Sequence, residues 1–488
     1  MSPFDAQANT DANDPIKHVV LLLLENRSFD QMLGCFQEIY PNLDGVDANA
    51  PARVNSDGVR QFQQLPTGVE QTPVDPRHRT ENVLNQLKDG NAGFVRDFAE
   101  FYGATASADD RQLIMSYYAR MFLPALHRMA RDFTICDHWF SSVPGPTWPN
   151  RFFAFSGTAS GRVDMPDGIR HPDLDNLIFR QHQTTLFDRL NEAGRSWKVY
   201  FYDFPSSLIL TNQREIHNLV KYHKIDRFFQ DVAHLKAEEF PDFALIEPKY
   251  AGQDQNDDHP PHNIMKGEKL IGDVYDGLRS NEELWKSSLL VVLFDEHGGF
   301  YDHVSPPPAV PPDEHHEQYS FDRLGVRVPA VLVSPWVSKR VESTQFDHTS
   351  LLKYLVNKWG LGPLGARTAA ANSIGVAITE TAPRTDTLPF IRISTSEVLP
   401  DRPDLEMEVN SDHHIALQAF AKYLRTEMGD AAKVLEEVAE GGRWMNLKAR
   451  VGKVFLRLGT FLTKELEDND QKRIKLAVDS VMTFLKRT

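Results

Sequence analysis

The feature that most constrains this chain is a run of apolar residues that stops on two carboxylates. Residues 289–304 read LLVVLFDEHGGFYDHV, so six apolar residues lead directly into Asp295 and Glu296. The run does not alternate with polar residues, which is typical of a strand buried on both faces of a sheet. Ligands of open α/β sheets bind at the carboxyl ends of strands, where buried carboxylates need a cation or hydrogen bonds. The stretch therefore indicates a cation site, and the alternative is a strand capped by solvated charges.

A second apolar run ends in the same way. Residues 17–24 read KHVVLLLL, and Glu25 and Asn26 follow them. If the two runs form parallel neighbouring strands, all four polar side chains lie on one rim of the sheet. Oxygen ligands of this kind suit hard or borderline divalent cations. The alternative is a helix N-terminus, with Asn26 as the cap and Asp30 near the positive end of the helix dipole.

A threonine at the start of a predicted helix is the candidate nucleophile. Residues 141–157 read SSVPGPTWPNRFFAFSG, in which the Pro-Gly-Pro run excludes regular structure and Pro149 suits a first helical turn. A hydroxyl at a helix N-terminus faces backbone N–H groups and the positive end of the dipole, which favours phosphate binding and an alkoxide. Thr147 fits this position, and the alternative is that Thr147 is only an N-cap.

Three histidines are candidates for phosphate binding and proton transfer. His259 and His262 bracket two prolines in the loop NDDHPPH, ahead of a helix predicted from about residue 265 to 280. His348 stands at the start of another predicted helix, which continues to Trp359. Histidines in such positions orient phosphate or relay protons. The alternative for a loop histidine is that it is only solvated.

These residues combine into one chemical hypothesis. The four polar residues after the two strands hold a divalent cation, which also binds the threonine oxygen and lowers the pKa of the hydroxyl. The threonine attacks phosphorus, while the histidines stabilise the phosphate oxygens, protonate the leaving group and activate water. The chain has no P-loop and no HExxH motif, so neither a P-loop nucleotide triphosphatase nor a zincin metalloprotease is supported. The predicted metal ligands are Glu25, Asn26, Thr147, Asp295 and Glu296.

Composition narrows the function classes further. The 488 residues carry a net charge of −15, which argues against a general nucleic-acid binder. The apolar block at residues 19–24 is too short to span a bilayer, and residues 1–17 lack the basic region of a signal peptide. We therefore expect a cytoplasmic protein, export by a leaderless route, or a chain whose leader is removed. Cys35 and Cys136 exclude a disulfide scaffold but leave one bridge open.

We expect two regions along the chain. A catalytic domain covers residues 1–385, in which residues 40–115 form an insertion that walls the pocket, and a C-terminal region covers residues 386–488. From Arg443 onward, apolar residues near helical spacing alternate with lysines and arginines. This pattern is compatible with an interfacial helix on anionic lipid, and the alternative is a docking or oligomerisation helix.

Six segments resemble, in order, the motifs of the phosphoesterase family, which contains bacterial and plant non-specific phospholipases C and a group of bacterial acid phosphatases. They span about residues 17–360 and read HVVLLLLENRSFDQMLG, VPGPTWPNRFFAFSG, NDDHPPHNIMKGEKLI, LFDEHGGFYDHV, GVRVPAVLVSPWV and FDHTSLLKYL. The resemblance implies an α/β fold, namely an alkaline-phosphatase-like three-layer sandwich with a central, mostly parallel sheet.

The resemblance also implies roles for single residues. Glu25 and Asn26 match the metal ligands of the ENxSFD motif, Asp295 and Glu296 match the DE pair, and Thr147 matches the nucleophile before PNR. The three histidines, His259, His262 and His348, match positions near the phosphate. The implied cofactor is a divalent metal ion, zinc or calcium.

The form PGPTxPNR resembles the phospholipases C more than the acid phosphatases. We therefore expect cleavage of phospholipids such as phosphatidylcholine to diacylglycerol and a phosphorylated head group. The alternatives are an acid phosphatase acting on phosphomonoesters, an exported lipase effector, and a non-catalytic protein that keeps the fold. Many family members carry a secretory leader and this sequence shows none, which leaves the export route open.

Overall fold

The computed structural model describes residues 14–165, 181–251, 254–316, 319–400 and 415–416. Within them, a sheet of eight strands has the order β12-β6-β11-β10-β1-β9-β7-β8. The basic tail predicted from Arg443 onward lies outside the described residues, and the boundary near residue 385 stays a prediction. The strands are β1 (His18–Leu24), β6 (Thr134–Cys136), β7 (Trp197–Phe201), β8 (Tyr222–Lys224), β9 (Phe243–Glu247), β10 (Ser288–Phe294), β11 (Ala330–Val333) and β12 (Arg340–Glu342).

The two apolar runs form the centre of this sheet. β1 and β10 pair in parallel from His18 opposite Ser288 to Leu24 opposite Phe294, and every residue of both strands is buried. β11 runs antiparallel to β10 and to β6, whereas the other neighbouring pairs are parallel. β11 begins only at Ala330, directly after Pro329, because proline has no N–H to donate to the ladder.

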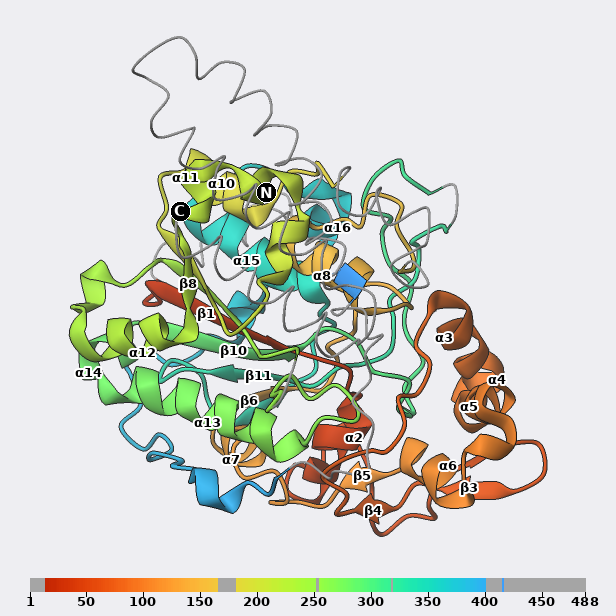
Figure 1. Cartoon of the computed structure of the whole chain (residues 1–488). Helices are drawn as coiled ribbons and strands as arrows, with labels where there is room; N and C mark the ends of the chain where they lie inside the picture. The colour runs from red at the N-terminus through yellow and green to blue at the C-terminus, as the bar shows by residue number, and fades with distance from the viewer. Residues whose placement is uncertain (1–13, 166–180, 252–253, 317–318, 401–414, 417–488) are drawn as a thin grey trace, which may run out of the picture.

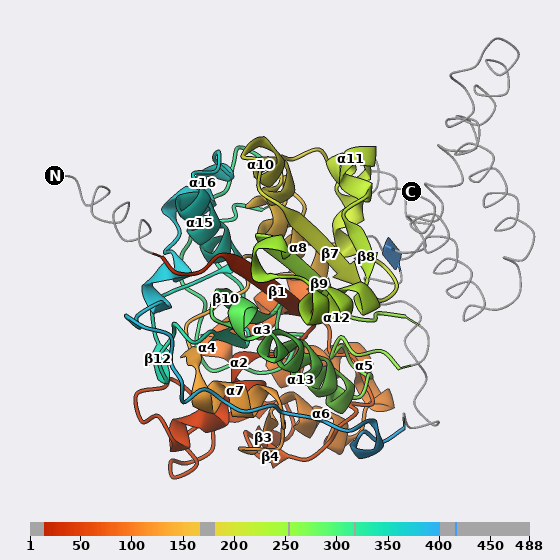
Figure 2. The ribbon, with the colours of Figure 1, turned by 90° about the vertical axis from the view of Figure 1, so that its left-hand side faces the viewer.

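Helices cover both faces of the sheet (Figures 1 and 2). One face carries α8 (Thr147–Ser156), α10 (Leu186–Glu192), α15 (His348–Trp359) and α16 (Gly365–Ala370). The other carries α7 (Leu126–Asp132), α12 (Ile225–His234) and α13 (Ile264–Ser280). The predicted three-layer α/β fold with a mostly parallel central sheet is therefore confirmed. The two remaining short helices of these layers are α11 (Ile216–Leu219) and α14 (Glu282–Trp285).

The segment after β1 builds a smaller unit beyond the carboxyl ends of β1 and β10 (Figure 1). It has its own apolar core, in which Val83, Phe94 and Ile114 are fully buried. Within this segment, residues 40–115 are the insertion that we predict to wall the pocket, and α2 and β5 lie outside those bounds. Its elements are α2 (Phe29–Leu33), β2 (Val54–Ser56), β3 (Gln61–Gln63), β4 (Pro66–Thr67), α3 (Thr80–Gln86), α4 (Lys88–Asn91), α5 (Phe94–Tyr102), α6 (Ala108–Ile114) and β5 (Tyr117–Tyr118).

The structure also bears on membrane spans and on the two cysteines. Across the described ranges, no helix has both the length and the apolar character needed to cross a bilayer. Cys35 and Cys136 are both buried and both free thiols.

Candidate active site

Three neighbouring parallel strands each deliver a buried carboxylate at their carboxyl ends. Glu247 is the last residue of β9, Glu25 follows β1, and Asp295 follows β10; none is more than 1% exposed. The Asp295 N–H donates to Leu24 O at 3.0 Å, which holds the two central strand ends together. The structure thus brings Glu25 and Asp295 to one rim. The sequence analysis missed Glu247, although the apolar stretch before it carries the same signal.

Arg151 of α8 lies across these three carboxylates. Its Nε donates to Asp295 Oδ2 at 2.9 Å, its Nη2 donates to Glu25 Oε1 at 3.2 Å, and its Nη1 lies 3.3 Å from Glu247 Oε2. Nη1 also donates to the Tyr250 hydroxyl at 2.9 Å. Because Arg151 is four residues after Thr147 in the same helix, about one turn of 5.4 Å, the start of α8 is tied to the strand ends.

Thr147 is the first residue of α8, and Pro146 is the N-cap. The alternative in which Thr147 acts as a plain N-cap is therefore wrong. The loop before the helix is held by Asn150, whose Oδ1 accepts from Val143 N at 3.1 Å and whose Nδ2 donates to Gly145 O at 3.0 Å. The Thr147 side chain is fully buried, and no hydrogen bond to another described residue engages its Oγ1.

The backbones of Asn26 and Gly298 pass close to each other at the rim. Asn26 has a φ of +60°, which asparagine tolerates better than most residues, and the N-cap of α2 is Ser28. The alternative in which Asn26 caps the helix is therefore wrong. Gly298 has a φ of +63°, and a Cβ there would lie 2.2 Å from Asn26 O, so only glycine fits.

Asp295 and Glu296 are fully buried, so the alternative of a strand capped by solvated charges is wrong. Glu296 Oε2 accepts from Gly298 N at 2.7 Å, whereas its Oε1 has no hydrogen-bond partner among the described residues. The same holds for Asn26 Oδ1 and Thr147 Oγ1. A buried acceptor left without a partner costs about 1–3 kcal/mol, so these three atoms favour a bound cation. Burial raises the pKa of both carboxyls, which a cation would reverse.

His78, a residue of the predicted insertion to which the sequence analysis assigned no role, lies beside the same rim. Its Nε2 lies 3.5 Å from Asn26 Nδ2 and 3.9 Å from Glu296 Oε1. Its Nδ1 donates to Pro76 O at 2.8 Å, so Nε2 presents a lone pair when the ring is neutral, and burial lowers the pKa of this ring. Asp75, His78 and His259 each place one ligand atom within 4.8 Å of the others. His78 does not follow an apolar run in the sequence, so the signal that predicted the other rim residues is missing there.

The loop that carries His259 and His262 is clamped to the end of β1. Glu25 N donates to Asp257 O at 2.8 Å, and Arg27 Nε donates to Asp258 O at 2.9 Å. His262 Nδ1 lies 2.5 Å from Asp257 Oδ1, which orients the ring. The two histidines are 2% and 3% exposed, so neither is a solvated loop histidine. Asp257 is a further residue to which the sequence analysis assigned no role of its own.

His348 engages both ring nitrogens within the protein. Trp139 Nε1 donates to Nδ1 at 3.3 Å, and Nε2 donates to Asp295 O at 2.6 Å. Burial lowers the pKa of His348 to about 4, so the ring is neutral near pH 7. In this arrangement His348 braces the backbone of Asp295, and a role in proton transfer stays a prediction that requires one of these bonds to open.

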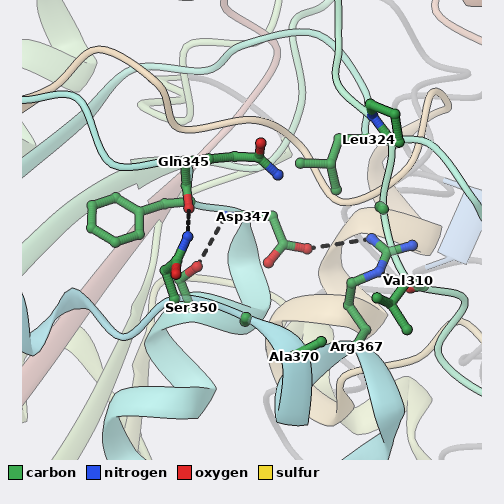
Figure 3. A pocket seen from close by; sticks show the side chains of 12 residues that line it. Val310, Leu324, Gln345, Asp347, Ser350, Arg367 and Ala370 are labelled. Carbon is green, nitrogen blue, oxygen red and sulfur yellow. Dashed lines mark hydrogen bonds and ion pairs between the residues drawn. The ribbon is translucent and has the colours of Figure 1, made fainter. Parts of the chain in front are cut away.

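A cavity of about 360 Å³ lies beside the start of α15 (Figure 3). Its wall includes Asp347, Ser350 and Arg367, and Asp347 Oδ2 pairs with Arg367 Nη1 at 3.5 Å. Asp347 is also the N-cap of α15, so the ion pair holds the helix that positions His348. None of the predicted metal ligands lines this cavity.

Comparison with known proteins points to one group. A family model described as the phosphoesterase family matches residues 16–362. Non-specific phospholipase C3 of Arabidopsis thaliana is 32% identical, over 87% of this chain and 88% of that protein. Phospholipase C A of Mycobacterium tuberculosis is 28% identical, over 71% of this chain and 73% of that protein. A solved structure of an alkaline phosphatase superfamily protein from Vibrio parahaemolyticus is 10% identical with a TM-score of 0.31, over 49% of this chain and 61% of that one.

Proposed function

The chain belongs to the phosphoesterase family and is a phospholipase C-like phosphoesterase, and we propose that it hydrolyses membrane phospholipids by a metal-dependent reaction through Thr147. The proposed substrate is a phosphodiester such as phosphatidylcholine, and the products are diacylglycerol and a phosphorylated head group. The names of the relatives support the substrate class, since they include plant and bacterial phospholipases C.

The observation that carries the proposal is the set of unpartnered oxygens at the rim. Asn26 Oδ1, Thr147 Oγ1 and Glu296 Oε1 are buried, and within the described ranges no hydrogen bond satisfies them. Oxygen ligands of this type fit a divalent cation, zinc or calcium in our hypothesis. The residues that would hold it are Glu25, Asn26, Thr147, Asp295 and Glu296. Bound there, the cation would supply a Lewis acid that favours the ionised threonine oxygen and offsets charge on the phosphate.

The first step transfers the phosphoryl group to the protein. Thr147 Oγ1 forms a bond to phosphorus as the bond from phosphorus to the diacylglycerol oxygen breaks. The N-terminus of α8 stabilises the phosphate oxygens as charge develops on them, because the N–H groups of its first turn have no partner within the helix and point out of its N-terminal end. His262, oriented by Asp257, is the best candidate to protonate the leaving oxygen.

The second step releases the head group. Water attacks the phosphothreonine, the bond from phosphorus to Thr147 Oγ1 breaks, and the ring that gave up its proton takes one from the water. His78 lies beside Asn26 and Glu296, and the His259 ring lies 6.2 Å from the His78 ring between centroids, so both rings are proposed to bind the phosphate oxygens. The basic C-terminal tail would add a contact with anionic lipid, which its sequence alone supports.

A substrate panel tests the proposal. The full chain is assayed on phosphatidylcholine vesicles and on p-nitrophenyl phosphate, before and after treatment with a chelator and after metal is restored. We expect a higher rate on the diester, loss of activity with chelation, and recovery with Zn²⁺ or Ca²⁺. An equal or higher rate on the monoester would replace the phospholipase with the acid phosphatase alternative, and activity that resists complete metal removal would end the metal hypothesis.

A further inference from the structure

We propose that Arg151 is the positioning residue of the cation site, because it joins the nucleophile helix to the ends of three strands. The inference rests on the proposed function for the identity of the site. Arg151 makes no hydrogen bond to the Thr147 hydroxyl, so we infer that it acts through the carboxylates that it binds.

The guanidinium of Arg151 is held in one orientation. The residue is fully buried, and Nε, Nη1 and Nη2 each donate to a different carboxylate. Nη1 also lies 3.3 Å from Ser206 Oγ, and the group sits 5.3 Å from the centre of the Tyr250 ring. A planar group with fixed donors at this spacing sets where each acceptor oxygen lies. A lysine at this position would present a single ammonium that cannot reach all three carboxylates at once.

Arg151 also limits how Asp295 can bind a cation. Asp295 Oδ2 accepts from Arg151 Nε, and its Oδ1 accepts from Asn26 N at 3.3 Å and from Glu296 N at 2.8 Å. A carboxylate offers about four lone-pair positions, so three bonds leave about one direction for a metal. The orientation of Glu25 is restricted in the same way through its Oε1. Both carboxylates are therefore preset before a cation arrives.

Glu247, which binds Arg151, is itself held by hydrogen bonds from two neighbouring side chains. Glu247 Oε1 accepts from Ser206 Oγ at 2.8 Å, and Glu247 Oε2 accepts from the Tyr250 hydroxyl at 2.7 Å. Glu247, at the end of β9, is thus an anchor for Arg151 that is not itself among the predicted cation ligands. Its charge also offsets the guanidinium, which would otherwise repel a cation next to it.

The test measures metal binding directly, so that it does not depend on the catalytic assay. Zn²⁺ and, separately, Ca²⁺ are titrated into the metal-free full chain by calorimetry, for the wild type and for Arg151→Lys. We expect the affinity to fall by about 10- to 100-fold in the variant, the usual effect of losing a group that orients metal ligands. Activity of the variant should return toward that of the wild type as the metal concentration is raised, which a purely structural role would not produce.

Arg327→Lys is the matched control. Arg327 is equally buried and also binds two carboxylates, those of Asp30 and Asp302, but it contacts none of the predicted metal ligands. We expect this variant to lose thermal stability while its metal affinity remains that of the wild type. If Arg151→Lys behaves like the control, with a lower melting temperature and unchanged metal affinity, the inference is overturned.

A second variant covers the case in which Arg151→Lys does not fold. Glu247→Gln keeps a hydrogen-bond acceptor for Arg151 and removes the opposing charge, and we expect a severalfold weaker metal affinity with the fold retained. Unchanged affinity in this variant would overturn the inference, as would a wild type that binds neither metal. A wild type that binds metal but does not hydrolyse phosphodiesters would overturn the proposed function alone.

Discussion

Two buried arginines of this protein each bind a group of acidic side chains, and the two groups differ in what they leave unsatisfied. Around Arg327, Nη2 donates to Asp30 Oδ1 at 3.0 Å and Nε donates to Asp302 Oδ1 at 2.9 Å. Asp30 Oδ2 accepts from Gln64 Nε2 at 2.9 Å and lies 2.8 Å from His303 Nδ1. Every carboxylate oxygen of this Arg327 cluster has a partner, whereas the rim around Arg151 leaves Glu296 Oε1 without one among the described residues.

The difference shows why residue types alone do not identify a metal site. Asp30, Asp302 and His303 have ligand atoms close enough to hold a cation, as Asp75, His78 and His259 do elsewhere. Two cationic side chains, Arg327 and His303, already balance the two carboxylates there. Burial by itself would lower the pKa of His303, but the Asp30 and Asp44 carboxylates raise it to about 9, so the ring is charged at neutral pH. The Arg327 cluster therefore has its charges balanced within the protein, and the rim is where we propose that a cation binds.

The largest expected effect is on catalysis. Thr147→Ala removes the proposed nucleophile, and we expect phosphodiesterase activity to fall by about 10⁴-fold or more, since nucleophile removal has effects of this order. Thr147→Ser keeps a hydroxyl and should retain part of the activity. Initial rates on phosphatidylcholine vesicles measure both. Comparable activity in wild type and Thr147→Ala would remove the rim from the mechanism altogether.

The next prediction compares one acid from each group. Glu296→Gln removes a buried carboxylate of which one oxygen, Oε1, lacks a hydrogen-bond partner among the described residues. We therefore expect metal affinity to drop by about 100-fold while the metal-free protein keeps its melting temperature. Asp302→Asn breaks a buried ion pair and should destabilise the fold by about 3–5 kcal/mol with no change in metal affinity. Calorimetric titration and chemical unfolding measure the two quantities. If both variants lose metal affinity, or if both lose stability, the proposed difference between the rim and the Arg327 cluster is wrong.

The Arg327 cluster also predicts a pH dependence of stability. The pKa of His303 is raised to about 9 in the folded state, so its contribution is complete below the unfolded value of about 6.5 and is lost as the pH rises through 9. We expect a loss on the order of 1–3 kcal/mol from this group, measured by urea unfolding of the metal-free protein between pH 6 and 10. His303→Gln should flatten that part of the profile. A profile that is equally steep in the variant would assign the effect to another group.

The smallest expected effect concerns hydrogen bonds at the periphery of each group. Tyr250→Phe removes the hydroxyl that bridges Arg151 and Glu247, and we expect metal affinity to weaken by about 2- to 10-fold, the value of one hydrogen bond. Gln64→Leu removes the matching bond to Asp30 and should cost about 1 kcal/mol of stability without affecting metal binding. An effect of Gln64→Leu on metal affinity would mean that the two groups are coupled.

Much of the fold could be predicted because its central strands are encoded locally. β1 and β10 are uninterrupted apolar runs, and a strand buried on both faces can only be built from such residues. The prediction of α13 from residue 265 to 280 is close to the observed Ile264–Ser280, because its N-cap, Asn263, and its periodicity are local signals. The apolar stretch of residues 133–140 forms a regular strand only over Thr134–Cys136, whereas Trp139 and Phe140 make isolated bridges to Phe346 and Arg327.

The sequence by itself determined which strands end on carboxylates and which helix begins at Thr147, because apolar runs and proline-rich turns act within a few residues. Only the tertiary structure decided that Glu247, His78 and Asp257 join the same rim and that Arg151 links its carboxylates. It also distinguished two acidic clusters of similar composition. In the Arg327 cluster every carboxylate oxygen has a hydrogen-bond partner, whereas the rim around Arg151 has a carboxylate oxygen without one among the described residues. The physical reason is that hydrogen-bond satisfaction depends on atoms brought together from distant segments, such as Arg151 and Glu25, and no local pattern records that meeting.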